Sequence, residues 1–273
     1  MPELPEVETV RNTLKHLVVG EEIQDVDIYY ERIIQHPTVA LFKKQIKGEE
    51  IQDVLRYGKY LIFKLTKGFL ISHLRMEGKY FLRGNEEKEK HEHIIFHLKS
   101  GKTLRYHDVR KFGTMHLYLN LSYEELLKKE PLNKLGLEPF SNNLNAEYLK
   151  DKLKTKSQAI KQLLLDQSII TGIGNIYADE ILFMARINPK KSGKLLNNDE
   201  LEKIIKYTKV VLEKAIQLGG TTIRSYSSDG ISGLFQNELL VHTKEKCPVC
   251  GKDITKIKIG GRSTYYCEYC QKE

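Results

Sequence analysis

Met1, Pro2 and Glu3, the first three residues of the chain, place a nucleophile beside a proton donor. If Met1 is removed, which the small residue at position 2 permits, the chain begins with the secondary amine of Pro2. An α-amine has a reference pKa of about 8, so near neutral pH it is unprotonated far more often than a lysine. Such an amine forms Schiff bases, and the carboxylic acid of Glu3 can pass protons to the group that is attacked. An amphipathic helix over 4–17 explains the apolar spacing that follows, but it gives no reason for Pro2.

The cysteines have the spacing of a zinc site. They form two Cys-x-x-Cys pairs, sixteen residues apart: Cys247, Cys250, Cys267 and Cys270. Four thiolates at this spacing predict one tetrahedral, structural zinc ion. The runs 253–259 and 262–267 predict two strands around a Gly-Gly turn. The zinc would hold this hairpin together without doing chemistry, and Arg262 just past the turn is a plausible phosphate contact.

Glycines open a predicted helix at TGIGNIYADE, residues 171–180. Such glycines leave backbone N–H groups directed at an anion, and the helix dipole adds to the attraction. A tight turn between two helices is the plainer interpretation of this motif. Together with the helical run 157–167 before it, the motif predicts a helix, turns and a second helix.

The composition favours an anionic polymer as partner. Lys plus Arg exceed Asp plus Glu, 44 against 36, for a formal charge of +8 and a pI near 9.0. Nucleic acid is preferred over a membrane on this balance. No apolar run approaches the ~20 residues that cross a bilayer. Because all the cysteines lie in the last 27 residues, no disulfide framework is expected elsewhere, and we predict a cytoplasmic protein.

Secondary-structure patterns predict an α+β, multidomain fold. A strand is expected over 21–34 and a short helix over 38–48, which Gly48 ends. Short β-rich runs separated by glycines over 51–118 are typical of an all-β sandwich. Beyond 144 the pattern is helical, with a long helix over 198–218. The predicted division is 1–120 for a β-sandwich domain with an N-terminal helix, 121–144 for a linker, 145–238 for a helical domain and 239–273 for a zinc hairpin.

The chain resembles bacterial formamidopyrimidine-DNA glycosylases. MPELPEVETV at the N-terminus carries the resemblance, and the order of the β-domain, the helical domain with TGIGNIYADE and the zinc hairpin extends it over the whole chain. Glu268 stands where many relatives have proline, outside the zinc ligands. The resemblance implies a helix-two-turns-helix (H2TH) element in the helical domain.

The resemblance also implies roles for single residues. Catalysis is implied for Pro2 as nucleophile, Glu3 as proton donor, Lys59 as a phosphate contact that assists β-elimination, and Arg262 in δ-elimination. DNA contacts are implied for His73, His91, Arg110, Lys156 and Asn175. Filling of the space left by an extruded base is implied for Met76, Arg110 and Phe112, a task that suits apolar wedges and an arginine.

The implied activity is that of a bifunctional DNA glycosylase and AP lyase of base excision repair. It excises oxidised purines, such as 8-oxoguanine and formamidopyrimidines, through a Schiff base on Pro2, and then cuts the strand by β,δ-elimination. The expected partner is double-stranded DNA with damaged bases. The enzyme is expected to act as a monomer at the nucleoid, without a small-molecule cofactor. Residues 219–238 form a long Gly-rich loop, which we predict to read the flipped base.

Two alternatives stay open from the sequence. An endonuclease VIII-like enzyme for oxidised pyrimidines shares the Pro-Glu start, although MPELPEVET and the loop 219–238 favour the purine branch. A non-catalytic zinc-ribbon DNA-binding protein is the second alternative. Pro2, Glu3, Lys59 and Arg262 argue against it, since binding alone needs no free proline amine.

Overall fold

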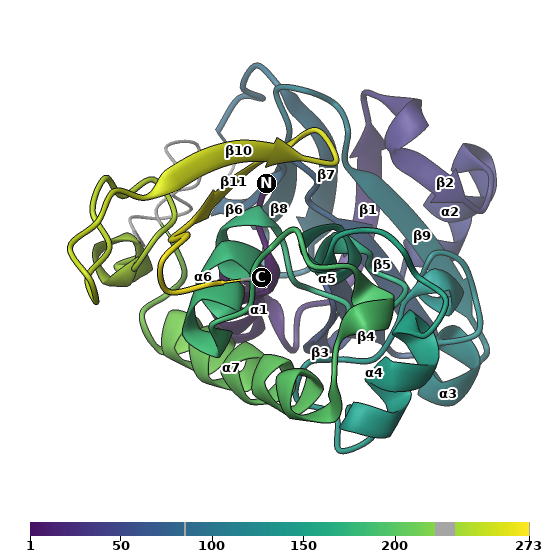
Figure 1. Ribbon diagram of the computed structural model, residues 1–273. Helices are drawn as coiled ribbons and strands as arrows, with labels where there is room; N and C mark the ends of the chain where they lie inside the picture. The colour runs from purple at the N-terminus through teal and green to yellow at the C-terminus, as the bar shows by residue number, and fades with distance from the viewer. Residues whose placement is uncertain (85, 222–232, 273) are drawn as a thin grey trace. The chain divides into compact units, whose positions relative to one another are not determined.

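The computed structural model describes residues 1–84, 86–221 and 233–272 (Figure 1). The chain divides into two compact units. The first contains Met1–Pro2 and Glu6–Asn133, and the second contains Glu3–Pro5, Lys134–Thr221 and the residues from Gly233 onward. Among the described residues, no helix has the length and apolar character needed to cross a membrane.

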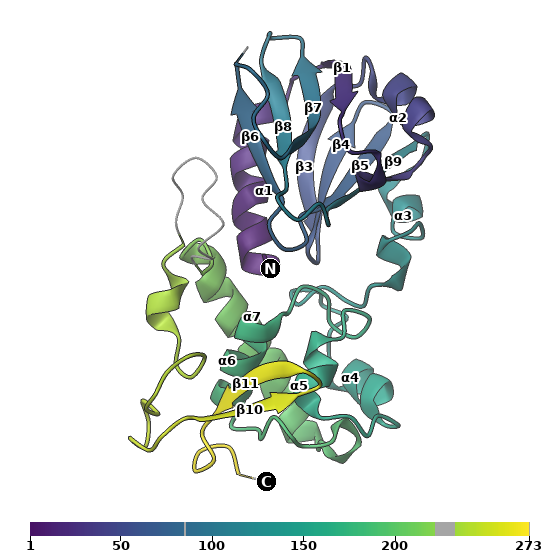
Figure 2. The ribbon, with the colours of Figure 1, turned by 90° about the horizontal axis from the view of Figure 1, so that it is seen from above.

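The first unit is a β-sandwich with helices at its edges. Its strands are β1 (Ile23–Ile28), β2 (Ile34–His36), β3 (Ile51–Tyr57), β4 (Tyr60–Leu65), β5 (Gly68–His73), β6 (Lys79–Arg83), β7 (Glu92–Leu98), β8 (Thr103–His107) and β9 (Thr114–Leu119). Its helices are α1 (Leu4–Val18, of which the first residues belong to the second unit), α2 (Val39–Ile46) and α3 (Tyr123–Leu126). Two short 3-10 turns complete it: η1 (Glu31–Ile33) and η2 (Leu132–Lys134), of which Lys134 belongs to the second unit. One sheet has the order β1-β7-β8-β6 and the other β2-β9-β5-β4-β3 (Figure 2).

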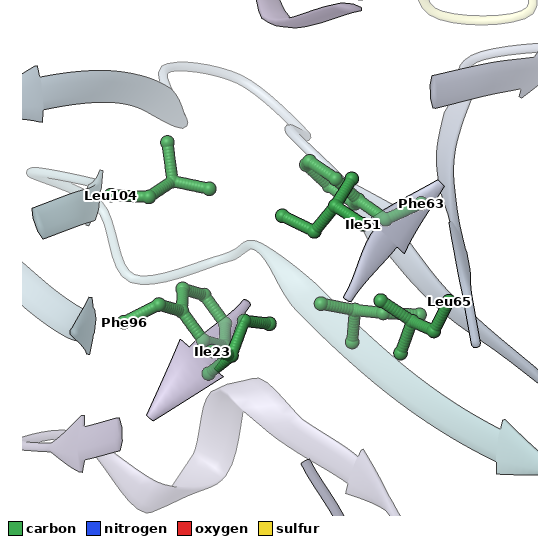
Figure 3. Close-up of a pocket in the computed structure, with 7 residues that line it drawn as sticks. Ile23, Ile51, Phe63, Leu65, Phe96 and Leu104 are labelled. Carbon is green, nitrogen blue, oxygen red and sulfur yellow. The ribbon is translucent and has the colours of Figure 1, made fainter. Parts of the chain in front are cut away.

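The inner faces of the two sheets meet in an apolar core. A small cavity between them is lined by side chains from both sheets: Ile23, Phe96 and Leu104 from one, and Ile51, Phe63, Leu65 and Leu70 from the other (Figure 3). The buried face of α1 joins this core through Val7, Val10 and Leu14. This arrangement confirms the predicted sandwich, because burial of one face of each sheet is what organises such a fold.

The second unit is helical and ends in a β-hairpin. Its elements are α4 (Ala146–Leu153), α5 (Ile160–Leu165), α6 (Asn175–Ala185), η3 (Gly193–Leu195), α7 (Asn198–Gln217), η4 (Phe235–Glu238), β10 (Thr255–Ile259) and β11 (Arg262–Tyr266). Leu4 is buried in the core of this unit. The hairpin turns at Gly260 and Gly261, whose φ angles of +55° and +76° suit a two-residue type I′ turn.

Some predicted elements were wrong in their extent. The predicted strand 21–34 is divided, because β1 pairs with β7 in one sheet while β2 pairs with β9 in the other. The predicted helix 157–167 is shorter and covers only Ile160–Leu165. The long helix expected over 198–218 is confirmed as α7.

The predicted base-reading loop, 219–238, lies largely outside the described residues, over 222–232. Its two ends are described. Gly219 and Gly220 have positive φ angles of +74° and +79°. The Leu234 N–H donates to the Leu218 carbonyl at 2.8 Å, so the ends of the segment are held together.

Candidate functional site

Glu3 is bound by the start of α6. Its Oε1 accepts a hydrogen bond from the Ile176 N–H at 3.1 Å, and the side chain is only 4 % exposed. Leu4 is held at the same place, since its N–H donates to the Gly172 carbonyl at 3.0 Å. One of the free N–H groups predicted from the glycine motif therefore donates to a carboxyl group that belongs to the chain itself. Pro2, directly before Glu3, is buried.

Gly174 leaves the space that the Glu3 carboxylate occupies. A Cβ at position 174 would overlap the Glu3 carboxyl carbon and lie 2.6 Å from its Cγ. We therefore expect Gly174→Ala to displace Glu3 and to slow base excision by roughly 100-fold or more, the range of general acid catalysis. Single-turnover excision measures this. Gly84→Ala is the control, because the nearest atom to its added Cβ lies 3.5 Å away on a flexible Glu86 side chain. Wild-type excision by Gly174→Ala would contradict the placement of Glu3.

Asn175 joins α6 to the hairpin that carries Arg262. Its Nδ2 donates to the Ser263 carbonyl at 2.9 Å, next to Arg262 in the chain. The structure thus gathers Glu3, Asn175 and the Arg262 hairpin around one helix start. Lys156 lies in the connection between α4 and α5, where its carbonyl accepts from the Lys194 N–H at 2.9 Å.

Lys161 and Asp179 form a buried ion pair beneath this site, and neither was singled out from the sequence. Lys161 Nζ lies 2.5 Å from Asp179 Oδ1 and donates to the Asn175 carbonyl at 2.8 Å. Burial lowers the pKa of Lys161, while the Asp179 charge opposes that shift. Asp179 Oδ2 also lies 2.6 Å from His242 Nδ1, and the His242 ring packs edge-on against Tyr265 of the hairpin. A lysine inside the apolar run of α5 was the signal available in the sequence.

The cysteine thiols fit the predicted zinc ion. The four Sγ atoms lie within 4.8 Å of one another. The Cys247–Cys270 and Cys250–Cys267 sulfur pairs are 3.8 Å and 3.5 Å apart. A tetrahedron with Zn–S bonds of about 2.3 Å requires sulfur separations of about 3.8 Å. These thiolates hold one structural zinc ion.

Metal analysis of the reduced protein is expected to find one zinc per chain. Cys250→Ser should lower that ratio and weaken DNA binding by more than about tenfold, because metal binding and folding of the hairpin are linked. Val249→Ser is the matched control, since Val249 lies in the same Cys-x-x-Cys turn with its side chain exposed. Substoichiometric zinc in active, reduced protein would refute the assignment.

Lys59 and His73 lie together in the first unit. Lys59 is buried in the turn after β3, and Tyr60 pairs with His73 across β4 and β5. Burial, followed by the charges of Arg75 and Lys59, lowers the pKa of His73 to about 3. Nδ1 of His73 accepts from the Arg75 N–H at 2.8 Å. His73 is therefore neutral near pH 7. Because Nδ1 is the acceptor, Nε2 carries the hydrogen and can donate a hydrogen bond to a phosphate oxygen.

His73 should make the stability of the protein depend on pH. Between pH 6.5 and about 3 the unfolded His73 binds a proton that the folded one does not. Its contribution to the free energy of unfolding is thus complete above pH 6.5 and is lost as the pH falls toward 3. Denaturant titrations at several pH values give the free energy of unfolding as a function of pH. In this window His73→Gln should reduce the slope of that dependence by at most about 1.4 kcal/mol per pH unit. An unchanged slope would mean that His73 is charged in the folded protein.

The predicted void-filling residues lie on two loops of the first unit. Met76 is half-buried between β5 and β6, whereas Phe112, between β8 and β9, is 51 % exposed. The Arg110 guanidinium stacks 4.7 Å from the centre of the Phe112 ring. Asp108 supports this second loop from inside. Its fully buried carboxylate accepts from the N–H groups of Arg110, Phe112 and Gly113 at 3.0, 2.9 and 2.8 Å.

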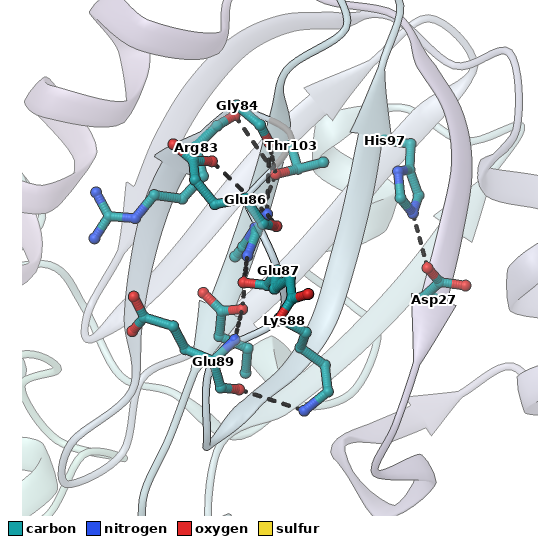
Figure 4. Close-up of polar contacts among 11 residues, drawn as sticks. Asp27, Arg83, Gly84, Glu86, Glu87, Lys88, Glu89, His97 and Thr103 are labelled. Carbon is teal, nitrogen blue, oxygen red and sulfur yellow. Dashed lines mark hydrogen bonds and ion pairs between the residues drawn. The ribbon is translucent and has the colours of Figure 1, made fainter.

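His91 follows a charged loop that the protein holds in place (Figure 4). The buried Arg105 guanidinium donates to the Glu92 carboxylate at 2.9 Å and to the carbonyls of Glu86 and Glu87 at 2.6 and 3.1 Å. His91 itself has a positive φ of 73°, and its carbonyl accepts from the Asp108 N–H at 3.0 Å. The charged run 86–92 is therefore not wholly solvated, since Glu92 is buried.

Family models match three parts of the chain. The formamidopyrimidine-DNA glycosylase N-terminal domain matches residues 1–115, the formamidopyrimidine-DNA glycosylase H2TH domain matches 135–227, and the zinc finger found in FPG and IleRS matches 244–272.

Relatives and solved structures match over the whole length. A formamidopyrimidine-DNA glycosylase of Oceanobacillus iheyensis is 48 % identical over 276 residues, covering 99 % of this chain and 98 % of the relative. That of Halalkalibacterium halodurans is 47 % identical, with all of both chains covered. The Lactococcus lactis Fpg, solved in complex with DNA containing an abasic site, has a TM-score of 0.90 at 41 % identity, covering 99 % of this chain and 100 % of that one. The chain belongs to the formamidopyrimidine-DNA glycosylase family.

Proposed function

We propose that the chain is a bifunctional DNA glycosylase and AP lyase of base excision repair that excises oxidised purines from double-stranded DNA. The observation that carries this proposal is the Glu3 carboxylate bound at the start of α6, directly after Pro2. Once Met1 is removed, a buried acid fixed beside the free Pro2 amine suits Schiff-base chemistry. The names of the relatives, and the Fapy-dG and abasic-site DNA in the related Fpg complexes, support the substrate class.

The proposed reaction begins at the sugar. The Pro2 nitrogen attacks the anomeric carbon, and the bond to the base breaks, so that the base leaves with the bonding electron pair. Glu3 takes up the proton that the Pro2 nitrogen releases and passes it to the ring oxygen, so that the ring opens and an iminium ion forms on Pro2. The iminium acidifies the neighbouring C–H bond, so that loss of this proton expels the 3′ phosphate. The resulting conjugated iminium acidifies a second C–H bond of the sugar, and loss of that proton expels the 5′ phosphate. Lys59 assists the first elimination and Arg262 the second, and hydrolysis of the Schiff base frees Pro2.

The remaining residues bind the duplex in this proposal. His73, His91, Arg110, Lys156 and Asn175 contact DNA, while Met76, Arg110 and Phe112 fill the space of the extruded base. The proposed domains are the catalytic β-sandwich 1–120, the linker 121–144, the H2TH domain 145–238 and the zinc hairpin 239–273. The protein acts as a monomer in the cytoplasm, at the nucleoid.

Borohydride trapping on three duplexes tests the proposal. The duplexes carry 8-oxoguanine, thymine glycol or an abasic site. We expect covalent complexes with 8-oxoguanine and with the abasic site, and much less with thymine glycol. Preference for thymine glycol would assign the chain to the oxidised-pyrimidine enzymes instead. Binding without any trapped complex would make it a non-catalytic DNA-binding protein.

A further inference from the structure

Tyr106 lies beneath both loops that carry the void-filling residues. It is fully buried on β8, and its hydroxyl lies 3.4 Å from Asp108 Oδ2, at the base of the Arg110–Phe112 loop. Tyr106 pairs with Tyr80 of β6, the strand that follows the Met76 loop. One rigid side chain thus reaches from one loop to the other inside a single unit.

The glycine that ends each loop rests on the Tyr106 hydroxyl. Gly78 ends the Met76 loop, and its N–H donates to the Leu74 carbonyl at 2.9 Å. A Cβ on Gly78 would overlap the Tyr106 hydroxyl and lie 2.9 Å from its Cζ. Gly113 ends the other loop, and a Cβ there would overlap the same hydroxyl and lie 2.6 Å from the same Cζ. Neither loop can shift toward the core without displacing Tyr106.

We propose that Tyr106 is a positioning residue that couples the two loops, so that Met76 enters the duplex together with Arg110 and Phe112. The inference rests on the proposed base-extruding function and adds a mechanical link to it. Close packing transmits displacement, because a filled interior has few voids to absorb it. If Met76 meets resistance at the base stack, its loop is displaced toward the core. This displacement passes through Gly78 and the Tyr106 hydroxyl to Gly113 and the loop before it.

A single-tryptophan reporter tests this coupling. The chain has no tryptophan, so Phe112→Trp gives a fluorescence signal from one loop only. After rapid mixing with 8-oxoguanine duplex, the tryptophan fluorescence should change in a phase that reports the movement of the second loop. Adding Met76→Ala to Phe112→Trp should slow this tryptophan phase by about tenfold, an effect of the size expected for energetically coupled residues. With Tyr106→Phe added, the same Met76→Ala change should alter the phase by less than about twofold. Gly78→Ala, which displaces Tyr106 from the other loop, should slow the phase as well.

Tyr80→Phe is the matched control. It removes a buried hydroxyl from the neighbouring ring, where it donates to Ser72 Oγ at 2.7 Å, outside both loops. It should leave the effect of Met76→Ala intact. The inference is overturned if Met76→Ala leaves the tryptophan phase unchanged, or if it slows that phase equally with Tyr106→Phe. If Tyr106→Phe does not fold, the effect of Met76→Ala alone on the tryptophan phase of Phe112→Trp still tests whether the two loops are coupled. Borohydride trapping by the wild type at an abasic site tests the proposed function separately.

Discussion

Pro2→Gly is expected to abolish base excision and borohydride trapping on 8-oxoguanine DNA while the protein stays folded. Glycine replaces a secondary amine with a primary one and removes the pyrrolidine ring that restricts rotation about the N–Cα bond. The nucleophile then loses both its fixed position and its ready formation of an iminium ion. Because positioning of reacting groups is worth many orders of magnitude, we expect a rate loss of roughly 10³-fold or more. Single-turnover excision and trapping measure it.

Pro5→Gly is the control for Pro2→Gly, because it removes a proline from the start of α1 without changing the terminal amine. Its trapping yield should stay close to that of the wild type. A protein that retains Met1 should be as inactive as Pro2→Gly, since its terminal amine is no longer the proline nitrogen. Efficient trapping of Pro2→Gly through an internal lysine would show that another residue is the nucleophile.

Local patterns predicted much of the fold, because they report which faces are buried. The short β-rich runs between glycines over 51–118 predicted the sandwich, and the Gly260-Gly261 turn predicted the hairpin. The strand 21–34 failed for a physical reason. Its apolar residues continue past Tyr29, but β1 and β2 pair with β7 and β9, which are far away in sequence. A local sequence pattern can indicate which residues are buried, but it cannot indicate which distant strand a segment will pair with.

The site could be predicted only in part for a similar reason. Glycines at 172 and 174 indicated an anion at a helix start, yet only the folded chain shows that the Glu3 carboxyl group binds there. Asp108 and Tyr106 were not singled out, because a buried aspartate and a buried tyrosine give no periodic signal. Their importance comes from contacts with loops that close around them. The cysteine spacing, by contrast, carries its chemistry in the sequence itself.

Glu3→Gln is expected to keep DNA affinity within about twofold and to reduce 8-oxoguanine excision by roughly 10²- to 10⁴-fold, the range of general acid catalysis. The glutamine Oε1 can still accept from the Ile176 N–H, so the N-terminal segment stays in place. What disappears is the proton for the sugar ring oxygen. At a preformed abasic site no base has to leave and the sugar ring opens in water, so strand cleavage there should be reduced much less.

Glu8→Gln is the matched control for Glu3→Gln. The Glu8 carboxylate lies on α1 and pairs with Arg11 and Arg56, so its loss removes a charge from the same helix without touching α6. Glu8→Gln should lower the excision rate only as far as it lowers the stability of the protein. The contrast between intact and abasic DNA then separates proton donation from support of the fold, since damage to the fold lowers both rates together. Wild-type excision by Glu3→Gln would exclude Glu3 as the acid, and equal loss on both substrates would give it a structural role.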